Sequence, residues 1–307
     1  MKLDNAKIDY TISDERQHGK EINVAFQGEL YPEQQRAAED MLPHDCGILA
    51  AATAFGKTAV GAYIVAEKKV NTLILVHNKE IMKNWTDDFG KFLDIAEEPP
   101  EYKTKSGRTK RRQSVIGKLH AAHNSLTGII DVVMFTSLGK AGDINPMVKD
   151  YGLVIMDECH HAGAPTAQEV LREINARFVF GMTATPKRDD GQEKKMFMQL
   201  GAVRHRFTAK DKAKLQGMEH FVYPRFTRLI NTTGDKLLIN EAYKLVISNE
   251  FRNKQIIADV EECVRNGRTP LVLTKFRNHA ETLRKMLEDN LMRVDSKDIA
   301  QELLELI

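Results

Sequence analysis

Residues 51–58 read Ala-Ala-Thr-Ala-Phe-Gly-Lys-Thr and have the residue types of a loop that holds the phosphates of a nucleotide. The usual pattern of such a loop is G-x-x-x-x-G-K-S/T. Here Ala51 stands at the first glycine position, while Gly56, Lys57 and Thr58 match the others. Backbone N–H groups at the start of a helix bind the phosphates, so Ala51 leaves this chemistry intact. We expect Lys57 to reach the β- and γ-phosphates and the Thr58 hydroxyl to bind Mg²⁺.

The sequence around this loop supports the interpretation. Residues 47–50 are a short apolar run typical of a buried strand, and residues 59–66 continue as a helix. The loop therefore lies between a strand and a helix, as phosphate binding requires. The alternative is an ordinary strand–turn–helix with an exposed Lys-Thr pair.

Two carboxylates, Asp157 and Glu158, follow a second apolar run at residues 153–156. In open α/β sheets, ligands bind outside the carboxyl ends of the strands. We expect Asp157 to hold Mg²⁺ through water and Glu158 to polarise the attacking water. A solvated acidic turn after a strand is the alternative, but a phosphate loop in the same fold disfavours it.

The neighbouring Cys159, His160 and His161 raise the question of a zinc site. Adjacent residues on a turn diverge, and no second Cys/His pair lies nearby in the sequence. We therefore expect no zinc at this position.

Length and composition are those of a globular protein with two domains: 307 residues, 42% of them hydrophobic. The three cysteines, Cys46, Cys159 and Cys263, lie far apart in the sequence, which suggests reduced thiols and a cytoplasmic protein. No apolar stretch approaches the roughly 18 residues of a membrane span, and the first residues lack the apolar run of a signal peptide.

The net charge of +2 is too small to indicate a nucleic-acid partner, but its distribution is uneven. Residues 103–112 contain six Lys and Arg side chains and no acidic residue. Such a cluster could contact the phosphates of DNA or RNA, or it could be a solvated, mobile loop. Both interpretations stay open.

Strand and helix patterns alternate along the chain, which predicts a parallel sheet covered on both faces. The predicted strands are residues 7–12, 21–26, 47–50, 73–76, 129–135, 153–156, 178–180 and 271–274, and the predicted helices are residues 32–41, 59–66, 79–89, 240–266 and 279–288. We expect a β-rich extension at 1–29, a first α/β domain at 30–206, a polar linker or insertion at 207–239 and a partial second α/β domain at 240–307.

These segments together resemble the superfamily 2 helicases of the DEAD/DEAH-box type. The chain looks most like the branch that contains the XPB-type DNA helicases and the motor subunits of type I and type III restriction enzymes. Gln34 lies in a segment similar to the adenine-reading glutamine motif. The other segments that resemble helicase motifs are 52–58 (motif I), 72–85 (motif Ia), 132–138, 157–160 (motif II in its DECH form), 181–186 (motif III), 187–191 and 270–287 (motif IV).

The resemblance implies a RecA-like fold and hydrolysis of ATP with Mg²⁺. The residues implied to bind the nucleotide are Gln34, Thr53, Ala54, Phe55, Gly56, Lys57 and Thr58, with Thr58 and Asp157 as metal ligands and Lys57, Asp157 and Glu158 as catalytic residues. Thr136, Ser137, Thr183 and Thr185 are implied to contact nucleic acid or to couple it to hydrolysis. By the branch resemblance alone, DNA is expected rather than RNA, and no membrane is expected as a partner.

The second RecA-like domain is expected to be incomplete, because nothing after residue 290 resembles the motif whose arginines reach the γ-phosphate. Unwinding by this chain alone is therefore not expected, although ATP binding is. The alternative function is a nucleotide- or DNA-binding module of a larger restriction or defence assembly, with little turnover of its own. A small-molecule P-loop kinase fits less well, because a kinase needs neither the DECH segment nor the Thr183-Ala184-Thr185-Pro186 segment.

Overall fold

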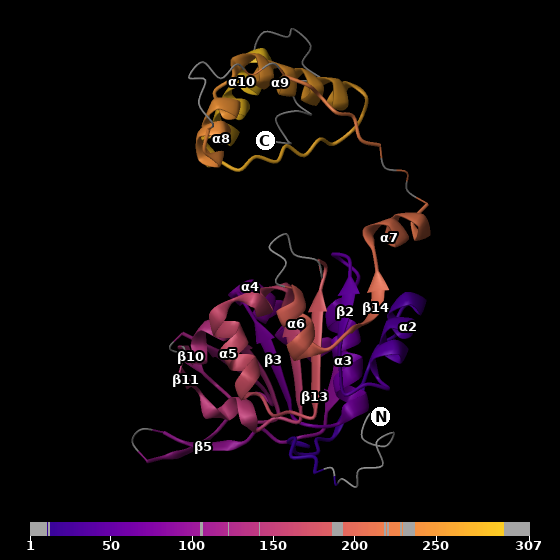
Figure 1. Ribbon diagram of the computed structural model, residues 1–307, viewed down its shortest axis with the longest axis vertical. Coiled ribbons are helices and arrows are strands. Elements are labelled where there is room, and N and C mark those ends of the chain that lie inside the picture. Colours follow the sequence, from indigo (N-terminus) through magenta and orange to yellow (C-terminus); the bar gives the residue numbers. More distant parts are fainter. Residues whose placement is uncertain are drawn as a thin grey trace. The chain divides into compact units, whose positions relative to one another are not determined.

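The computed structural model describes residues 11, 13–104, 107–121, 123–140, 142–185, 193–217, 219, 221–227, 229 and 237–291. The chain divides into two compact units, Met1–His220 and Phe221–Ile307 (Figure 1). The division falls inside the segment 207–239 that the sequence predicts as a linker or insertion. Of the predicted strand 7–12, only residue 11 is described, and the helicase-like segment 187–191 and Pro186 lie outside the described residues.

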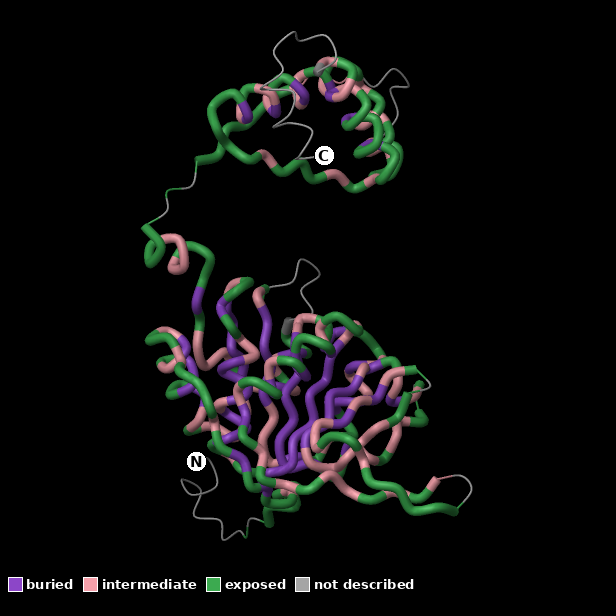
Figure 2. Tube along the Cα trace, turned by 180° about the vertical axis from the view of Figure 1, so that it is seen from behind, coloured by how far each residue is buried: buried purple, intermediate pink, exposed green. Residues whose placement is uncertain are grey.

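An eight-stranded sheet forms the centre of the first unit (Figures 1 and 2). Its strands lie in the order β14-β2-β13-β12-β3-β9-β7-β8, and every neighbouring pair is parallel except β7 with β8. Their bounds are β2 Cys46–Ala51, β3 Thr72–Val76, β7 Ile116–His120, β8 His123–Asn124, β9 Ile130–Met134, β12 Leu153–Asp157, β13 Phe178–Thr183 and β14 Val203–Phe207. The predicted parallel α/β sheet is confirmed.

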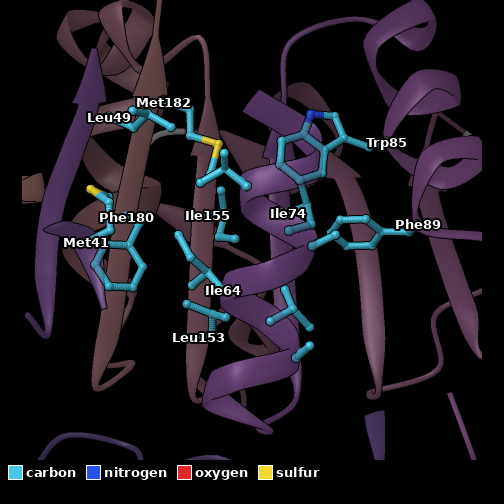
Figure 3. Packing of buried hydrophobic residues seen from close by; sticks show 14 of the residues in the cluster. Met41, Leu49, Ile64, Ile74, Trp85, Phe89, Leu153, Ile155, Phe180 and Met182 are labelled. Atoms are coloured by element: carbon cyan, nitrogen blue, oxygen red, sulfur yellow. The ribbon is translucent and has the colours of Figure 1, made fainter. Parts of the chain in front are cut away.

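Helices cover both faces of this sheet, which explains why its central strands are continuous apolar runs. On one face, α2 (Pro32–Met41), α3 (Lys57–Lys68) and α4 (Lys79–Phe92) pack in a core with Ile74, Ile155 and Phe180 (Figure 3). On the other face, α5 (Pro165–Glu173) and α6 (Glu193–Leu200) pack in a second core with strand residues such as Leu73, Leu75 and Val154.

The first unit also contains shorter strand pairs and 3-10 helices. β1 (Val24–Phe26) pairs with β4 (Leu93–Ile95), and β10 (Gly139–Lys140) pairs with β11 (Asp143–Ile144), both antiparallel. β5 (Glu101–Lys103) and β6 (Thr109–Arg111) form an antiparallel hairpin. Three 3-10 helices complete the unit: η1 (Phe135–Ser137), η2 (Pro146–Lys149) and η3 (Cys159–Gly163).

The polar stretch 210–216, which belongs to the predicted linker or insertion, forms most of the helix α7 (Ala209–Leu215). A local capping box explains why a helix starts there. The Thr208 side chain accepts from the Asp211 backbone N–H, and the Asp211 carboxylate accepts from the Thr208 backbone N–H at 2.9 Å. These reciprocal bonds satisfy donors that the helix start would otherwise leave unpaired.

The described part of the second unit contains three helices: α8 (Ile239–Ile247), α9 (Glu250–Arg265) and α10 (Arg277–Leu291). The single helix predicted over 240–266 is wrong, because Asn249 accepts from the Arg252 N–H and starts a new helix. The predicted strand 271–274 has no pairing among the described residues, and Leu271 and Leu273 are exposed. A strand requires a neighbour for its backbone groups, and the described part of this unit offers none.

A buried carboxylate near the start of β9 connects several segments by hydrogen bonds. Asp131 in β9 is fully buried and accepts hydrogen bonds from the Tyr151 hydroxyl (2.6 Å) and from the backbone N–H groups of Thr127 (2.8 Å) and Gly128 (2.7 Å). Burial raises the pKa of Asp131, and these hydrogen bonds oppose that rise. The site is structural, because it joins β9 to the loop before it and to the segment before β12.

We predict that Tyr151→Phe lowers the free energy of unfolding by about 1–3 kcal/mol, because it removes a donor from a buried carboxylate. Thermal unfolding should show a lower midpoint, by roughly 2–4 °C for each kcal/mol. Tyr223→Phe, which removes an exposed hydroxyl, is the control. An equal midpoint for both variants would contradict the prediction.

Candidate nucleotide site

The loop between β2 and α3 has the backbone shape that phosphate binding requires. Ala54 (φ 57°) and Gly56 (φ 87°) adopt left-handed conformations, and Gly56 is the N-cap of α3 without a side chain to cap it. The first N–H groups of α3 are thus presented at the helix start, where the helix dipole favours an anion. Ala51 lies in β2, where extended backbone has no need of glycine. This accounts for the departure from the usual pattern.

Lys57 lies at the first position of α3, and its Nζ donates to the carbonyl oxygen of Ala51 at 3.3 Å. The ammonium group is therefore folded back over the loop. Near the start of the loop, the Thr53 carbonyl oxygen accepts a hydrogen bond of 3.2 Å from Lys212 Nζ on α7. The loop is thus bonded to its own lysine and to the helix that follows β14.

Gln34 is buried beneath this loop. Its Nε2 donates to the Phe55 carbonyl oxygen (2.8 Å), and its Oε1 accepts from the Tyr31 backbone N–H (3.0 Å). A Cβ atom at Gly56 would collide with this amide, which is a second reason for glycine there. In this structure Gln34 supports the phosphate loop, and its contact with adenine stays a prediction.

Asp157, the last residue of β12, is held by two donors. Its Oδ2 accepts from the Trp85 indole N–H at 2.7 Å, and its Oδ1 accepts from the Glu158 backbone N–H at 2.8 Å. Burial raises the pKa of Asp157, and the hydrogen bonds from Trp85 and Glu158 oppose that rise. The sequence had placed Trp85 in the segment resembling motif Ia but had assigned it no role.

Glu158 has a left-handed backbone (φ 46°), an uncommon and strained conformation for a residue with a side chain. The chain turns sharply there from β12 into η3. Glu158 Oε2 lies 3.2 Å from His160 Nδ1, which also lies 3.1 Å from the Thr183 hydroxyl on β13. Thr183 is fully buried and its hydroxyl accepts from the Thr185 backbone N–H at 3.1 Å. His160 therefore joins the carboxylate pair to the end of β13.

Cys159 is part of the second hydrophobic core. Its Sγ is buried 3.7 Å from Met196 Sδ, and burial raises the pKa of the thiol well above its usual range. His161 instead packs on His77, with ring centroids 4.8 Å apart. Within the described ranges, no group of three His, Cys, Asp or Glu residues could hold a metal ion by itself.

A pocket of about 410 Å³ unites the phosphate loop with the carboxylate pair. Side chains of α4 form its remaining wall. The lining residues are Ala54, Phe55, Gly56, Lys57, Thr58, Ile81, Asn84, Trp85, Asp87, Asp88, Lys91, Asp157 and Glu158. The Thr58 hydroxyl and the Asp157 carboxylate supply the hard oxygen ligands that Mg²⁺ prefers, so the donor set fits this ion. The acidic α4 residues Asp87 and Asp88 in this wall had no role in the sequence analysis.

The residues expected to contact nucleic acid lie outside this pocket. Thr136 is exposed in η1, directly after β9, and the neighbouring Ser137 hydroxyl accepts from the Ala121 backbone N–H at 2.9 Å. Because β9 and β2 are connected by parallel pairs only, η1 lies at the same edge of the sheet as the phosphate loop. A larger cavity of about 570 Å³ in the second unit is lined by residues of α9, of α10 and of the segment 270–274, and it lacks a phosphate loop.

Comparison with known families identifies the larger part of the chain. The family described as "Type III restriction enzyme, res subunit" matches residues 27–188, more than half of the chain. The chain belongs to this family, whose members are superfamily 2 helicases. The matched range contains Gln34, the phosphate loop, the carboxylate pair and Thr183.

Relatives of this family member are named as helicases or translocases. The chain is 28% identical over 196 residues to the "DNA 3'-5' helicase XPB" of Kineococcus radiotolerans, covering 62% of this chain and 32% of that protein. It is 26% identical over 185 residues to the "DNA 3'-5' translocase XPB2" of Sulfurisphaera tokodaii, covering 60% and 37%. A protein of Acanthamoeba polyphaga mimivirus, provisionally named an ATP-dependent RNA helicase, is 24% identical over 282 residues, covering 87% and 50%. The match thus spans half or less of each of these relatives.

Among solved structures, the UvsW helicase from bacteriophage T4 matches 66% of this chain and 74% of its own, with 17% sequence identity and a TM-score of 0.45. Among the described residues of this helicase-family chain, no helix is long and apolar enough to cross a membrane.

Lys57→Ala should weaken or abolish ATP binding, because it removes the cation that we expect to meet the β- and γ-phosphates. A charge-assisted hydrogen bond contributes about 1.5–3 kcal/mol, so affinity should fall by roughly 10- to 150-fold or more. Isothermal titration calorimetry with ATP and Mg²⁺ measures the change. Lys20→Ala, at an exposed lysine remote from the loop in sequence, should retain wild-type affinity. Unchanged affinity in Lys57→Ala would refute the phosphate-loop assignment.

Proposed function

We propose that this chain is the ATP-binding and ATP-hydrolysing part of a helicase or translocase that acts on nucleic acid, with DNA preferred over RNA. The observation that carries the proposal is the single pocket lined by Lys57, Thr58, Asp157 and Glu158 at the carboxyl edge of a parallel sheet. Family membership supports hydrolysis, and two relatives named for DNA support the preference.

Each side chain has a role in this proposal that follows from its chemistry. Lys57 binds the β- and γ-phosphates, and the first N–H groups of α3 hold the phosphate oxygens. Thr58 and Asp157 hold Mg²⁺, which when bound neutralises the charge on the phosphates. Glu158, which lines the pocket, accepts a proton from the attacking water.

Coupling to nucleic acid is proposed to run through His160. Its Nδ1 lies within hydrogen-bonding distance of both Glu158 and Thr183, so a shift of the Thr183-Ala184-Thr185 segment would change the surroundings of the catalytic carboxylate. Thr183 itself is buried and acts in coupling. Exposed Thr136 is better placed to contact a phosphate, together with Ser137 and Thr185.

One observation favours the alternative of a nucleotide- or DNA-binding module in a larger restriction or defence assembly. Among the described residues that line the pocket, the cations are Lys57 and Lys91, and none is an arginine. An arginine supplied to the γ-phosphate accelerates phosphoryl transfer by about a thousandfold or more. The binding-module alternative therefore predicts slow turnover that DNA does not stimulate.

ATPase assays with and without single-stranded DNA, duplex DNA and RNA discriminate the two functions. The motor proposal expects turnover that rises with DNA and rises less with RNA. ATP turnover that nucleic acid does not change supports the binding module, and a greater response to RNA contradicts the proposed preference.

The free thiols of Cys46, Cys159 and Cys263 are consistent with a proposed cytoplasmic location.

Glu158→Gln should keep ATP affinity within about twofold and lower kcat by about 100-fold or more, because the amide is nearly isosteric but cannot accept the proton. Calorimetry for binding and phosphate release for turnover are the two measurements. Glu67→Gln, on the exposed side of α3, is the matched control and should behave as wild type. Turnover near the wild-type rate in Glu158→Gln would exclude this residue as the proton acceptor.

The basic segment 103–112 includes the last residue of β5 and all of β6, and this antiparallel pair lies at the end of the unit opposite the phosphate loop (Figure 1). Lys103, Lys110 and Arg111 are exposed there. Arg112 stacks over the Tyr102 ring at 4.1 Å, and Arg111 pairs with Glu98 at 3.0 Å. The exposed cations of β5 and β6 can contact phosphates, but at a place separate from Thr136.

We predict that changing Lys103, Lys110 and Arg111 together to Gln weakens DNA binding and flattens its salt dependence. Each lost phosphate contact should lower the slope of log affinity against log salt by about 0.9. Titrations at several salt concentrations measure the slope. A matched triple change of exposed Lys20, Arg36 and Lys210 to Gln controls for net charge. Equal slopes for the two triple variants would favour a merely solvated hairpin.

A further inference from the structure

Trp85 lines the nucleotide pocket and contacts Asp157 of the carboxylate pair. It is the only tryptophan of the chain, is 1% exposed and lies on α4. Its indole N–H donates to Asp157 Oδ2 at 2.7 Å, across 72 positions in the sequence. The indole also lines the pocket itself. The proposed roles of Lys57, Thr58, Asp157 and Glu158 do not involve this side chain.

The indole ring fits closely against the helix that starts at the phosphate loop. A Cβ atom at Gly61 of α3 would lie 2.7 Å from Trp85 Cη2 and 2.9 Å from Cζ3. Glycine inside a helix costs about 1 kcal/mol relative to alanine, so close packing is the evident reason for Gly61. The same Cβ atom would lie 3.2 Å from Met182 Cε, and Met182 precedes Thr183 on β13. Figure 3 shows Trp85 in this core, with Met182 and Ile74 nearby.

The orientation of the ring is set by packing on its other side. Phe89, one helical turn later on α4, meets the indole edge-to-face with centroids 5.2 Å apart. With α3 on one side and Phe89 on the other, the N–H vector is directed at Asp157. An indole N–H can only donate, so it pairs with a carboxylate oxygen and favours the observed orientation of Asp157.

The two donors leave part of the Asp157 carboxylate for a ligand. A carboxylate has about four lone-pair sites. The Trp85 N–H uses a site on Oδ2, and the Glu158 N–H uses a site on Oδ1. Each oxygen therefore keeps a further acceptor site, and the orientation of both is fixed before any ligand enters. Thr58, the other expected metal ligand, lines the same pocket.

We propose that Trp85 is a positioning residue that fixes the Asp157 carboxylate for the magnesium ion of the nucleotide complex. The inference rests on the proposed function, since it takes Asp157 as the residue that holds the ion. Partners of this kind, which orient a ligand without touching the metal, typically change metal affinity by about 10- to 100-fold when removed.

The test separates the N–H group from the volume of the ring. Trp85→Phe keeps an aromatic ring without the donor. Because the chain has one tryptophan, replacing tryptophan throughout by β-(3-benzothienyl)alanine changes only this position, and it exchanges the N–H for sulfur in a ring of nearly the same shape. Phe89→Leu is the packing control, because it disturbs the same core and leaves the donor in place.

Two affinities are measured by calorimetry for each protein: that for ATP in excess EDTA, and that for Mg²⁺ in the protein–ATP complex. The second is derived from ATP titrations at a series of free Mg²⁺ concentrations, because free ATP also binds Mg²⁺. Thermal unfolding is recorded for each protein to confirm that it is folded. We expect both donor-free proteins to lose about 10-fold or more in Mg²⁺ affinity, while ATP affinity in EDTA stays within about twofold. Phe89→Leu should lower the unfolding midpoint and retain the wild-type ratio of the two affinities.

Unchanged Mg²⁺ affinity in the folded benzothienylalanine protein would overturn the positioning role and leave the proposed function intact. An equal loss of both affinities would also overturn it, because a purely structural role predicts that result. If the unmodified chain bound no ATP in either condition, the proposed function would fail first, and the positioning role with it.

Discussion

The parallel pairing of β2, β13 and β12 is the constraint on which the rest of the site depends. Their register places Met182 beside Leu49 on one side and beside Asp157 on the other. The phosphate loop, the carboxylate pair and the Thr183 segment all leave the sheet at one edge as a result. Hydrogen-bond ladders of buried strands do not slip without turning apolar side chains outward, so this alignment is held by the whole core.

The nucleotide site combines a buried carboxylate with residues whose local conformation is unfavourable. Asp157 is nearly removed from water, and two donors offset its desolvation. Glu158 adopts a left-handed backbone conformation, and Gly61 is an unfavourable residue in the interior of α3. Such departures from local preference are typical of functional sites, because a sequence optimised only for stability would avoid them.

The elements that the sequence predicted well are those decided by local pattern. The strands at 47–50, 73–76 and 153–156 are continuous apolar runs, and buried parallel strands require such runs. The predictions were wrong where a single side chain sets a helix boundary or where a strand requires a partner distant in the sequence. Asn249 divides the helix predicted over 240–266, and residues 271–274 have no strand beside them in the described part of their unit. The phosphate loop is a local pattern, whereas the contact from Trp85 to Asp157 depends on how α4 packs and could not be read from spacing.

The solitary indole beside the carboxylate has a practical consequence for spectroscopy. Tryptophan emission depends on the polarity and charge around the ring, and here all of it arises from one buried ring hydrogen-bonded to Asp157. The protein therefore carries an intrinsic optical probe within its nucleotide pocket, and no dye has to be attached. Signals recorded from it describe the surroundings of one carboxylate, undiluted by any second chromophore of the same kind.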